Sequence, residues 1–206
     1  MTIAEILTAF ELQVGDTTEL SSAEELMVLN RVRRRINRKP MEANRKAFSG
    51  TQSTSLPYVA LPSDFFRVAQ NNNYSGPQYY SENPVVFVGT LRTPVTLIPF
   101  ADRGQYVNAS DKAYLDLPNE RLYFTLQPTA TNSLNFDYYA LPADLLINGS
   151  DWITNKFPEA LIYGMATEDF ILQLSDKARS YAPENQAKYL EEMAEIASWN
   201  FSFIQR

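Results

Sequence analysis

The apolar periodicity of the sequence changes at residues 58–68, and this change constrains the fold more than any other feature. Before this stretch apolar residues recur at helical spacing, whereas after it they recur at every second position. Two short extended segments, 59–61 and 66–68, flank a turn that contains Pro62 and Asp64. Proline fixes its own φ, and an aspartate can accept hydrogen bonds from nearby backbone amides. We therefore expect residues 58–68 to form a hinge where a β block leaves a helical part.

Two capping boxes mark the starts of helices in the N-terminal part. Thr2 and Ser21 are each followed three residues later by a glutamate, the pattern in which both side chains satisfy first-turn backbone groups. Apolar residues then follow at helical spacing, as far as Gly15 in the first segment and Pro40 in the second. The pattern predicts two short antiparallel helices joined by a brief loop, with a further helical turn within residues 41–50.

Residues 57–140 have the pattern of short strands separated by turns. The predicted strands after residue 68 are residues 86–88, 91–98, 113–117, 122–126 and 134–139. Residues 118–120 form the turn of a predicted hairpin, and Pro94 interrupts the second strand. The polar residues 71–77 are expected to form an exposed loop. This spacing of strands and turns is typical of a small antiparallel sandwich or barrel-like sheet.

Helical periodicity returns after Pro142. Pro158 suits the first turn of a long helix, and Pro183 is expected to start the last one. Neither end of the chain carries enough apolar surface to fold alone, so both are expected to pack into one bundle. The predicted fold class is α+β. A helical bundle from residues 1–56 and 141–206 carries an inserted antiparallel β-sandwich-like block, residues 57–140.

The 206-residue chain contains neither cysteine nor histidine. This absence excludes disulfide scaffolds, thiolate zinc sites, cysteine nucleophiles and Ser-His-Asp triads. We expect no catalysis, no metal and no cofactor. No apolar run is long enough to span a membrane, and the N-terminus lacks the basic start of a secretory signal. We therefore expect a soluble protein that is made in a cytoplasm. The net charge of −6 disfavours general affinity for nucleic acid.

One basic cluster stands out, and its members are Arg31, Arg33, Arg34, Arg35, Arg38 and Lys39. On a helix, Val32 and Ile36 would face inward and the basic side chains would cover the remaining surface. Three interpretations stay open. In the first, the cluster is a solvated helix face, or it forms ion pairs between subunits with Glu191, Glu192 and Glu195. In the second, it contacts an acidic surface of a neighbouring subunit, and in the third it contacts DNA phosphates.

The C-terminal residues are unusually apolar for a chain end. The predicted partner-binding residues here, for another subunit or a partner protein, are Trp199, Phe201, Phe203, Ile204 and Arg206. Such a segment would fray if it were left in water. Either it folds back on its own bundle, or it docks as an arm into a groove of another subunit or partner.

Carboxylates are the remaining candidates for chemistry. Those of the β block are Asp64, Asp102, Asp111, Asp116 and Asp137. Two carboxylates at strand spacing are common by chance, and no phosphate loop, dinucleotide fingerprint or calcium loop accompanies them. A carboxylate-only hydrolase of cell-wall sugar therefore remains only as a distant alternative.

The order of these features resembles the head-to-tail adaptor, or connector, proteins of tailed bacteriophages. The resemblance covers nearly the whole chain and rests on the combination of features. The matching segments are the helix at 3–10, the second helix with its basic end, 58–65, 122–128, 134–142 and 157–164. The loop at 71–77 and the break at Pro94 depart from the pattern.

The resemblance implies a ring, usually of twelve subunits, beneath the portal protein. Genome DNA would pass through its channel without specific binding, and tail, nozzle or fibre proteins would bind its far side. It implies a helical bundle carrying a β insertion, a virion location after assembly in the host cytoplasm, and no membrane. It implies no catalytic site. A different virion protein, such as a tail-tube or fibre-docking module, stays open as an alternative.

Overall fold

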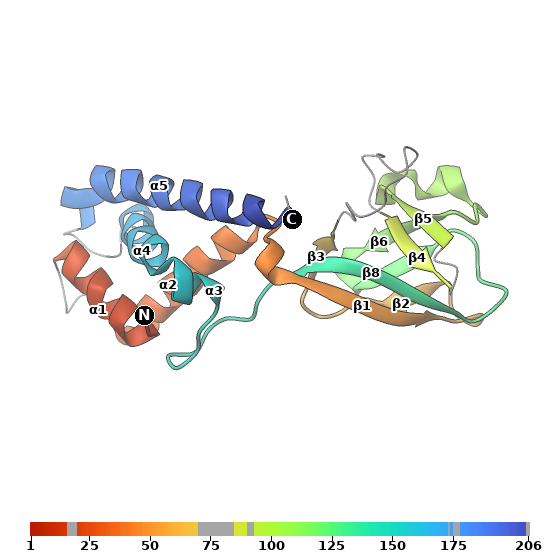
Figure 1. Ribbon diagram of the computed structural model, residues 1–206, viewed down its shortest axis with the longest axis horizontal. Helices are drawn as coiled ribbons and strands as arrows, with labels where there is room; N and C mark the ends of the chain where they lie inside the picture. Colours follow the sequence, from red (N-terminus) through yellow and green to blue (C-terminus); the bar gives the residue numbers. More distant parts are fainter. Residues whose placement is uncertain (16–19, 70–84, 90–92, 173, 175–177, 205–206) are drawn as a thin grey trace. The chain divides into compact units, whose positions relative to one another are not determined.

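The computed structural model describes the chain except residues 16–19, 70–84, 90–92, 173, 175–177 and 205–206 (Figure 1). The chain divides into two compact units. The helical unit comprises Met1–Ala43 and Pro142–Arg206, and the β unit comprises Asn44–Leu141. Each unit has its own cluster of buried apolar residues. The predicted α+β class, with helices from both ends of the chain, is confirmed.

The helical unit contains five described α-helices. They are α1 (Ile3–Val14), α2 (Ser22–Asn37), α3 (Trp152–Lys156), α4 (Pro158–Leu172) and α5 (Ala178–Ile204). Both predicted capping boxes are present, at Thr2 and at Ser21. Gly15 ends α1 in the left-handed conformation, with φ of 71°, which glycine adopts without steric cost. These local signals therefore predicted α1 and α2 correctly.

Helix α4 is the centre of the helical unit, and α1, α2, α3 and α5 all pack against it. Ala160, Leu161, Met165 and Ala166 on α4 are buried, as expected for a helix that has neighbours on several sides. Gly164 allows α2 to lie close to α4. A Cβ at this position would lie 2.5 Å from Cγ1 of Val32 on α2.

The start of the last helix differs from the prediction. Pro183 lies inside α5, which already begins at Ala178. A proline inside a helix removes one backbone hydrogen bond and tends to kink or break the helix, yet α5 continues across Pro183 as far as Ile204. The prediction that Pro158 begins a long helix is confirmed, because α4 starts at that residue.

The β unit is built on one eight-stranded sheet. Its strands are β1 (Arg45–Gln52), β2 (Tyr58–Ala60), β3 (Phe65–Val68), β4 (Val85–Val88), β5 (Thr93–Ile98), β6 (Lys112–Asp116), β7 (Arg121–Phe124) and β8 (Asn132–Ala140). The order is β1-β8-β4-β5-β6-β7-β2, and β3 also pairs with β8. Short 3₁₀ segments are η1 (Glu42–Asn44), η2 (Phe100–Tyr106) and η3 (Leu117–Asn119). The predicted hairpin is the β6–β7 pair, which η3 joins.

The sheet is mixed, whereas the sequence pattern predicted an antiparallel one. Strands β5 and β6 run parallel, with Thr96 opposite Lys112, and η2 lies in the connection between them. Strand β8 alternates as predicted, because Leu134, Phe136 and Tyr138 are buried and the residues between them are not. Strand β8 pairs with β1 along one edge and with β3 and β4 along the other.

Pro94 does not interrupt its strand. It lies inside β5, opposite Phe87 of β4. Pairing of β5 with β6 begins only at Thr96, so the proline occupies a part of β5 that β6 does not reach, where a missing amide hydrogen is tolerated. The predicted loop at residues 71–77 lies outside the described residues.

The junction between the units also differs from the prediction. A helical turn does occur within residues 41–50, as the 3₁₀ segment η1. It ends at Asn44, and Arg45–Gln52 is strand β1, which pairs with β8 from Arg45 opposite Tyr139 to Gln52 opposite Asn132. The β unit therefore begins at Asn44, fourteen residues before the start of the predicted hinge at 58–68. The two extended segments of that stretch are confirmed as β2 and β3, and both lie within the β unit.

Candidate interaction site on the helical unit

Helix α2 presents its arginines on two opposite sides. Arg33 was predicted to belong to an exposed basic face, and this prediction is wrong, because only 1% of its side chain is exposed. Its Nε donates to Oδ2 of Asp151 at 2.8 Å, and its Nη1 donates to Oδ1 of Asn30 and to the carbonyl of Ala143. A guanidinium can be buried in this way only when charge and hydrogen bonds compensate its lost hydration.

The partners of Arg33 hold the segment that returns from the β unit. Asn30 accepts a hydrogen bond from the amide of Leu145 and donates one to its carbonyl. Asp151 caps α3 by accepting from the amides of Ile153 and Thr154. The polar side of α2 therefore holds the segment at residues 143–151, which we call the connector, against the helices.

The other side of α2 carries exposed arginines that gather around one buried carboxylate. Glu168 of α4 is 1% exposed and forms ion pairs with Arg31 and Arg35, whose side chains are 51% and 45% exposed. The Arg31 Nε to Glu168 Oε2 distance is 2.8 Å. Both arginines lie beside the C-terminal half of α4, where the helix dipole also favours positive charge.

These arginines line a depression of about 380 Å³. Its lining residues are Met27, Val28, Arg31, Arg34, Arg35, Arg38 and Leu172. Arg34 reaches Asp144 only at 3.7 Å, and both side chains are more than half exposed. Within the described part of the chain, four guanidiniums thus face two carboxylates, so the depression keeps a net positive charge. We call it the arginine depression. Lys39 is exposed but lies elsewhere, at the end of α5.

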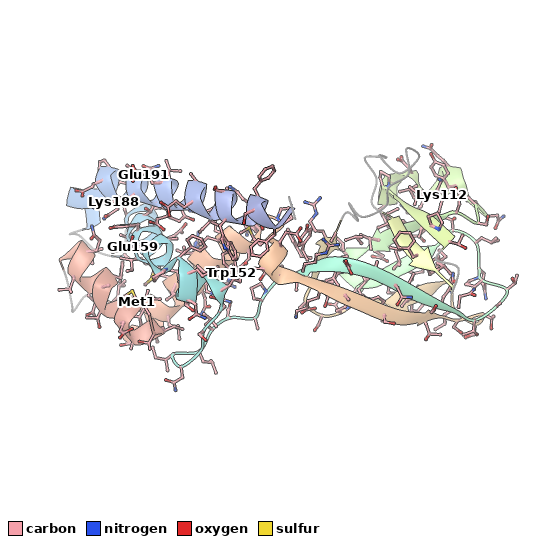
Figure 2. The ribbon with its side chains drawn as sticks, viewed as in Figure 1. Met1, Lys112, Trp152, Glu159, Lys188 and Glu191 are labelled. Carbon is pink, nitrogen blue, oxygen red and sulfur yellow. The ribbon has the colours of Figure 1, made fainter. Side chains whose placement is uncertain are left out.

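An acidic patch lies on the same unit, formed by Glu159 of α4 and Glu191, Glu192 and Glu195 of α5. Figure 2 locates Glu159 and Glu191 on their helices. Burial raises the pKa of Glu192, and the neighbouring Glu159 and Glu195 raise it further. Among the described residues no cation forms an ion pair with these four glutamates, and the nearby Lys188 pairs with Glu184 instead. Lys188 also attracts Glu191, but one lysine that is already paired leaves most of the negative charge of the patch without a partner in the described part of the unit.

The C-terminal aromatic segment is partly folded onto its own unit. Trp199 stacks on Trp152 at 5.1 Å between ring centroids and contacts Phe157 at 5.5 Å; Figure 2 labels Trp152. Phe203 packs edge-on against Trp199 but remains 45% exposed. Phe201 is 55% exposed. Ile204 ends α5, its side chain is outside the described part, and Arg206 lies outside the described residues.

A small apolar pocket lies beside Phe201. Its lining includes Lys39, Met41, Met193, Ile196, Ala197 and Asn200. Asn200 ties this end of α5 to the exit from α2, because it accepts from the Glu42 amide at 2.7 Å and donates to the Pro40 carbonyl. The predicted partner-binding residues thus divide. Trp199 is an anchor within the unit, and Phe201 is free to contact another molecule.

The β unit carries an aromatic row that the sequence did not reveal. The row comprises Phe100, Tyr114, Tyr123 and Tyr58, from η2, β6, β7 and β2. Tyr114 and Tyr123 stack at 5.3 Å with nearly parallel rings. Arg103 and Arg121 lie over the two end rings, 3.9 Å from Phe100 and 4.2 Å from Tyr58. Tyr114 and Tyr123 face each other on the predicted hairpin, but Tyr58 joins the row only because β2 pairs with β7.

A family model described as the SU10 adaptor protein matches residues 1–201. The chain belongs to the SU10 adaptor protein family. The predicted resemblance to bacteriophage adaptors is therefore confirmed at the level of the family. Membership supports a structural adaptor protein and a component of the virion. A search of curated proteins finds no significant match.

The carboxylates singled out in this adaptor take part in separate local contacts. Asp137 pairs with Arg45, and Asp64 accepts hydrogen bonds from Lys46 and Tyr138. Asp111 pairs with Lys112, and Asp116 accepts from Asn119; Asp102 lies in the exposed η2 segment. Within the described residues, no group of three potential ligands could hold a metal ion. None of the described helices combines the length and the apolar character needed to cross a membrane.

Proposed function

We propose that this adaptor is a subunit of a twelve-membered ring that joins the capsid portal protein to the tail of a bacteriophage. The proposal rests on membership of the SU10 adaptor family over residues 1–201. The protein acts by binding and carries out no catalysis. Its partners are the portal protein, the neighbouring subunits, and tail, nozzle or fibre proteins.

The exposed end of α5 supports a contact with the portal or a neighbouring subunit. Phe201 is 55% exposed beside an apolar pocket, and exposed aromatic residues next to such pockets are typical of binding hot spots. The helix beneath it is anchored by Trp199 and Asn200. An anchored helix end loses little conformational entropy when a partner binds it.

The aromatic row supports a tail-side contact for the β unit. Tyrosine and arginine are the residues that most often dominate protein interfaces. Here their side chains are already held by stacking and by the hydrogen bond from Arg121 to the Tyr123 hydroxyl, so little ordering is required on binding.

The charge of the chain supports passage of DNA without specific binding. The net charge is −6, and a negative surface repels the phosphate backbone instead of retaining it. Genome DNA is therefore expected to move through the ring without forming a lasting complex with it.

Native mass spectrometry of the full chain, alone and mixed with the portal protein of the same phage, tests this function. We expect a complex that contains the portal and several adaptor copies. A protein that stays monomeric and never joins the portal overturns the proposal.

The role of the α5 end has its own test, with a variant that stops after Asn200 and a Phe201→Ser variant. Both are expected to weaken portal binding more than they lower the melting temperature of the adaptor. The matched control is Leu12→Ser on α1, which changes another exposed apolar residue, 75% exposed. Portal binding as tight as that of the wild type would contradict a docking role for this helix end.

A further inference from the structure

The arginine depression has unused binding capacity. Arg31 and Arg35 are committed to the buried Glu168. Arg34 has only a distant partner, at 3.7 Å, and Arg38 is exposed at the end of α2. Among the arginines of the depression, these two are the ones that the buried Glu168 does not hold. Beside them Met27 is 54% exposed, so the depression also offers an apolar contact.

The acidic side of α5 has the complementary features. Glu191 and Glu195 are exposed and lie one helical turn apart. Leu190, next to them, is 60% exposed, which is high for a leucine on a helix that packs against α4. An exposed leucine beside glutamates that form no ion pair among the described residues matches an exposed methionine beside Arg34, whose ion pair is long, and the exposed Arg38.

The spacing of the charges also agrees. Arg34 on α2 and Arg38, which caps α2 in helical backbone conformation, are four residues apart, and Glu191 and Glu195 are four residues apart on α5. Each pair spans about 6 Å along its helix axis. Two helices that lie side by side can therefore form both ion pairs at once. We propose that the arginine depression of one copy binds the Glu191–Glu195 face of α5 in a second copy.

This contact joins two different surfaces of the chain, so each copy keeps one surface open for the next. A contact of this kind is heterologous, and it produces a closed ring when its rotation closes. The inference thus rests on the proposed ring and names the surfaces that would build it. Because both surfaces belong to the helical unit, the contact needs no particular arrangement of the β unit.

Charge reversal with rescue tests the contact. The variants are Arg34→Glu/Arg38→Glu, Glu191→Arg/Glu195→Arg, and all four changes together. Self-association of the full chain is measured by sedimentation velocity, and copies per complex are counted by native mass spectrometry with portal present. Each double variant is expected to associate at least about tenfold more weakly, since two attractive pairs become repulsive. The fourfold variant is expected to recover association to within about threefold of the wild type.

The controls separate this contact from general charge effects. Lys46→Glu/Arg67→Glu changes the net charge equally on exposed residues of the β unit and is expected to leave association unchanged. Arg31 and Arg35 are kept, because they hold the buried Glu168. Circular dichroism checks that each variant folds.

The outcomes distinguish the inference from the proposed function. Wild-type association that is indifferent to the reversals, or a wild type that never self-associates with or without portal, overturns the inference. Reversal-sensitive association in a protein that never joins portal supports the inference and overturns the proposed function. Reversals at Arg34 and Arg38 that leave association intact but abolish retention of duplex DNA assign the depression to nucleic acid and overturn the contact between copies.

Discussion

The two units of this adaptor are stabilised in different ways. Among the described residues, nearly all buried polar side chains belong to the helical unit: Glu25, Asn30, Arg33, Asn37, Thr154, Thr167, Glu168, Asp169 and Asn185. In the β unit Gln52 is the corresponding residue. The core of the β unit is otherwise apolar and aromatic, and its ion pairs, such as Arg45 with Asp137, lie at its surface.

The difference follows from how each kind of element is positioned. A strand is fixed in register by its hydrogen-bonded neighbours and by the side on which its alternate residues are buried. A helix packed through an apolar face has no such register. In the helical unit, buried polar contacts fix the relative positions of the elements. Arg33 and Asn30 attach the connector at 143–151, and Glu168 joins α4 to α2. Loss of a buried polar partner should therefore harm the helical unit most.

Arg33→Met is expected to have the largest effect. The change removes one partner of a buried ion pair and leaves the Asp151 carboxylate without its cation, which typically costs about 3–5 kcal/mol of unfolding free energy. It also removes the hydrogen bonds that Arg33 donates to the Ala143 carbonyl and to Oδ1 of Asn30. Urea unfolding followed by tryptophan fluorescence measures it, because both tryptophans, Trp152 and Trp199, lie in the helical unit.

The matched control is Arg34→Met on the exposed side of the same helix. Its pair with Asp144 is solvated and long, so a change below about 1 kcal/mol is expected. Equal losses from the two variants would show that burial of Arg33 contributes nothing specific to the helical unit.

Leu134→Ala is the corresponding change in the β unit. Leu134 is fully buried in β8, and truncation of such a leucine costs about 2–5 kcal/mol because it removes apolar burial and leaves a cavity. Since each unit has its own core, far-ultraviolet circular dichroism of the strands should shift while the tryptophan transition stays in place. A tryptophan transition that moves equally would show that the units unfold together.

Glu25 gives the helical unit a predicted pH dependence. Burial raises the pKa of Glu25 to about 7, and the nearby Glu11 contributes. The folded state therefore keeps a proton that the unfolded state loses above its ordinary pKa near 4.5. Stability from this group is largest below about pH 4.5, falls as the pH rises to about 7, and is constant above that.

Glu25→Gln removes this dependence. The variant is expected to be more stable than the wild type at pH 8, on the order of 2–3 kcal/mol, and similar at pH 4. Urea unfolding at both pH values measures the difference between the two proteins. A variant that is less stable than the wild type at pH 8 would contradict the burial of a proton at this site.

Elements with local signals could be predicted from the sequence. Capping boxes located α1 and α2, and alternation located β8. Strand β1 could not be found in this way. Its sequence contains two basic residues and a glycine and lacks clean alternation, so its conformation comes from pairing with β8. The predicted hinge was misplaced for the same reason, because the change of periodicity comes after the first strand.

The candidate site was predictable as a composition but not as a geometry. The basic cluster and the aromatic end were both recognised. Burial of Arg33 depends on Asp151, more than a hundred residues away, and anchoring of Trp199 depends on Trp152. Neither partner carries a sequence signal that identifies it. The aromatic row also required β2 to pair with β7, which no local pattern specifies.

Asp64, in the stretch where the periodicity changes, tests the smallest expected effect. Burial opposes ionisation of Asp64, but hydrogen bonds from Lys46 and Tyr138 outweigh it and lower its pKa. Its stabilising contribution is therefore present above the ordinary pKa and is lost as the pH falls through the lowered one. Asp64→Asn is expected to cost about 1 kcal/mol at pH 7 and nothing near pH 2, measured by the thermal transition of the β signal. Asp111 pairs with Lys112, and the Asp111 side chain is 63% exposed, so Asp111→Asn should change stability less. If the Asp64 contact contributes much less unfolding free energy than the Arg33 contacts, strand register and not polar contacts positions the elements of the β unit.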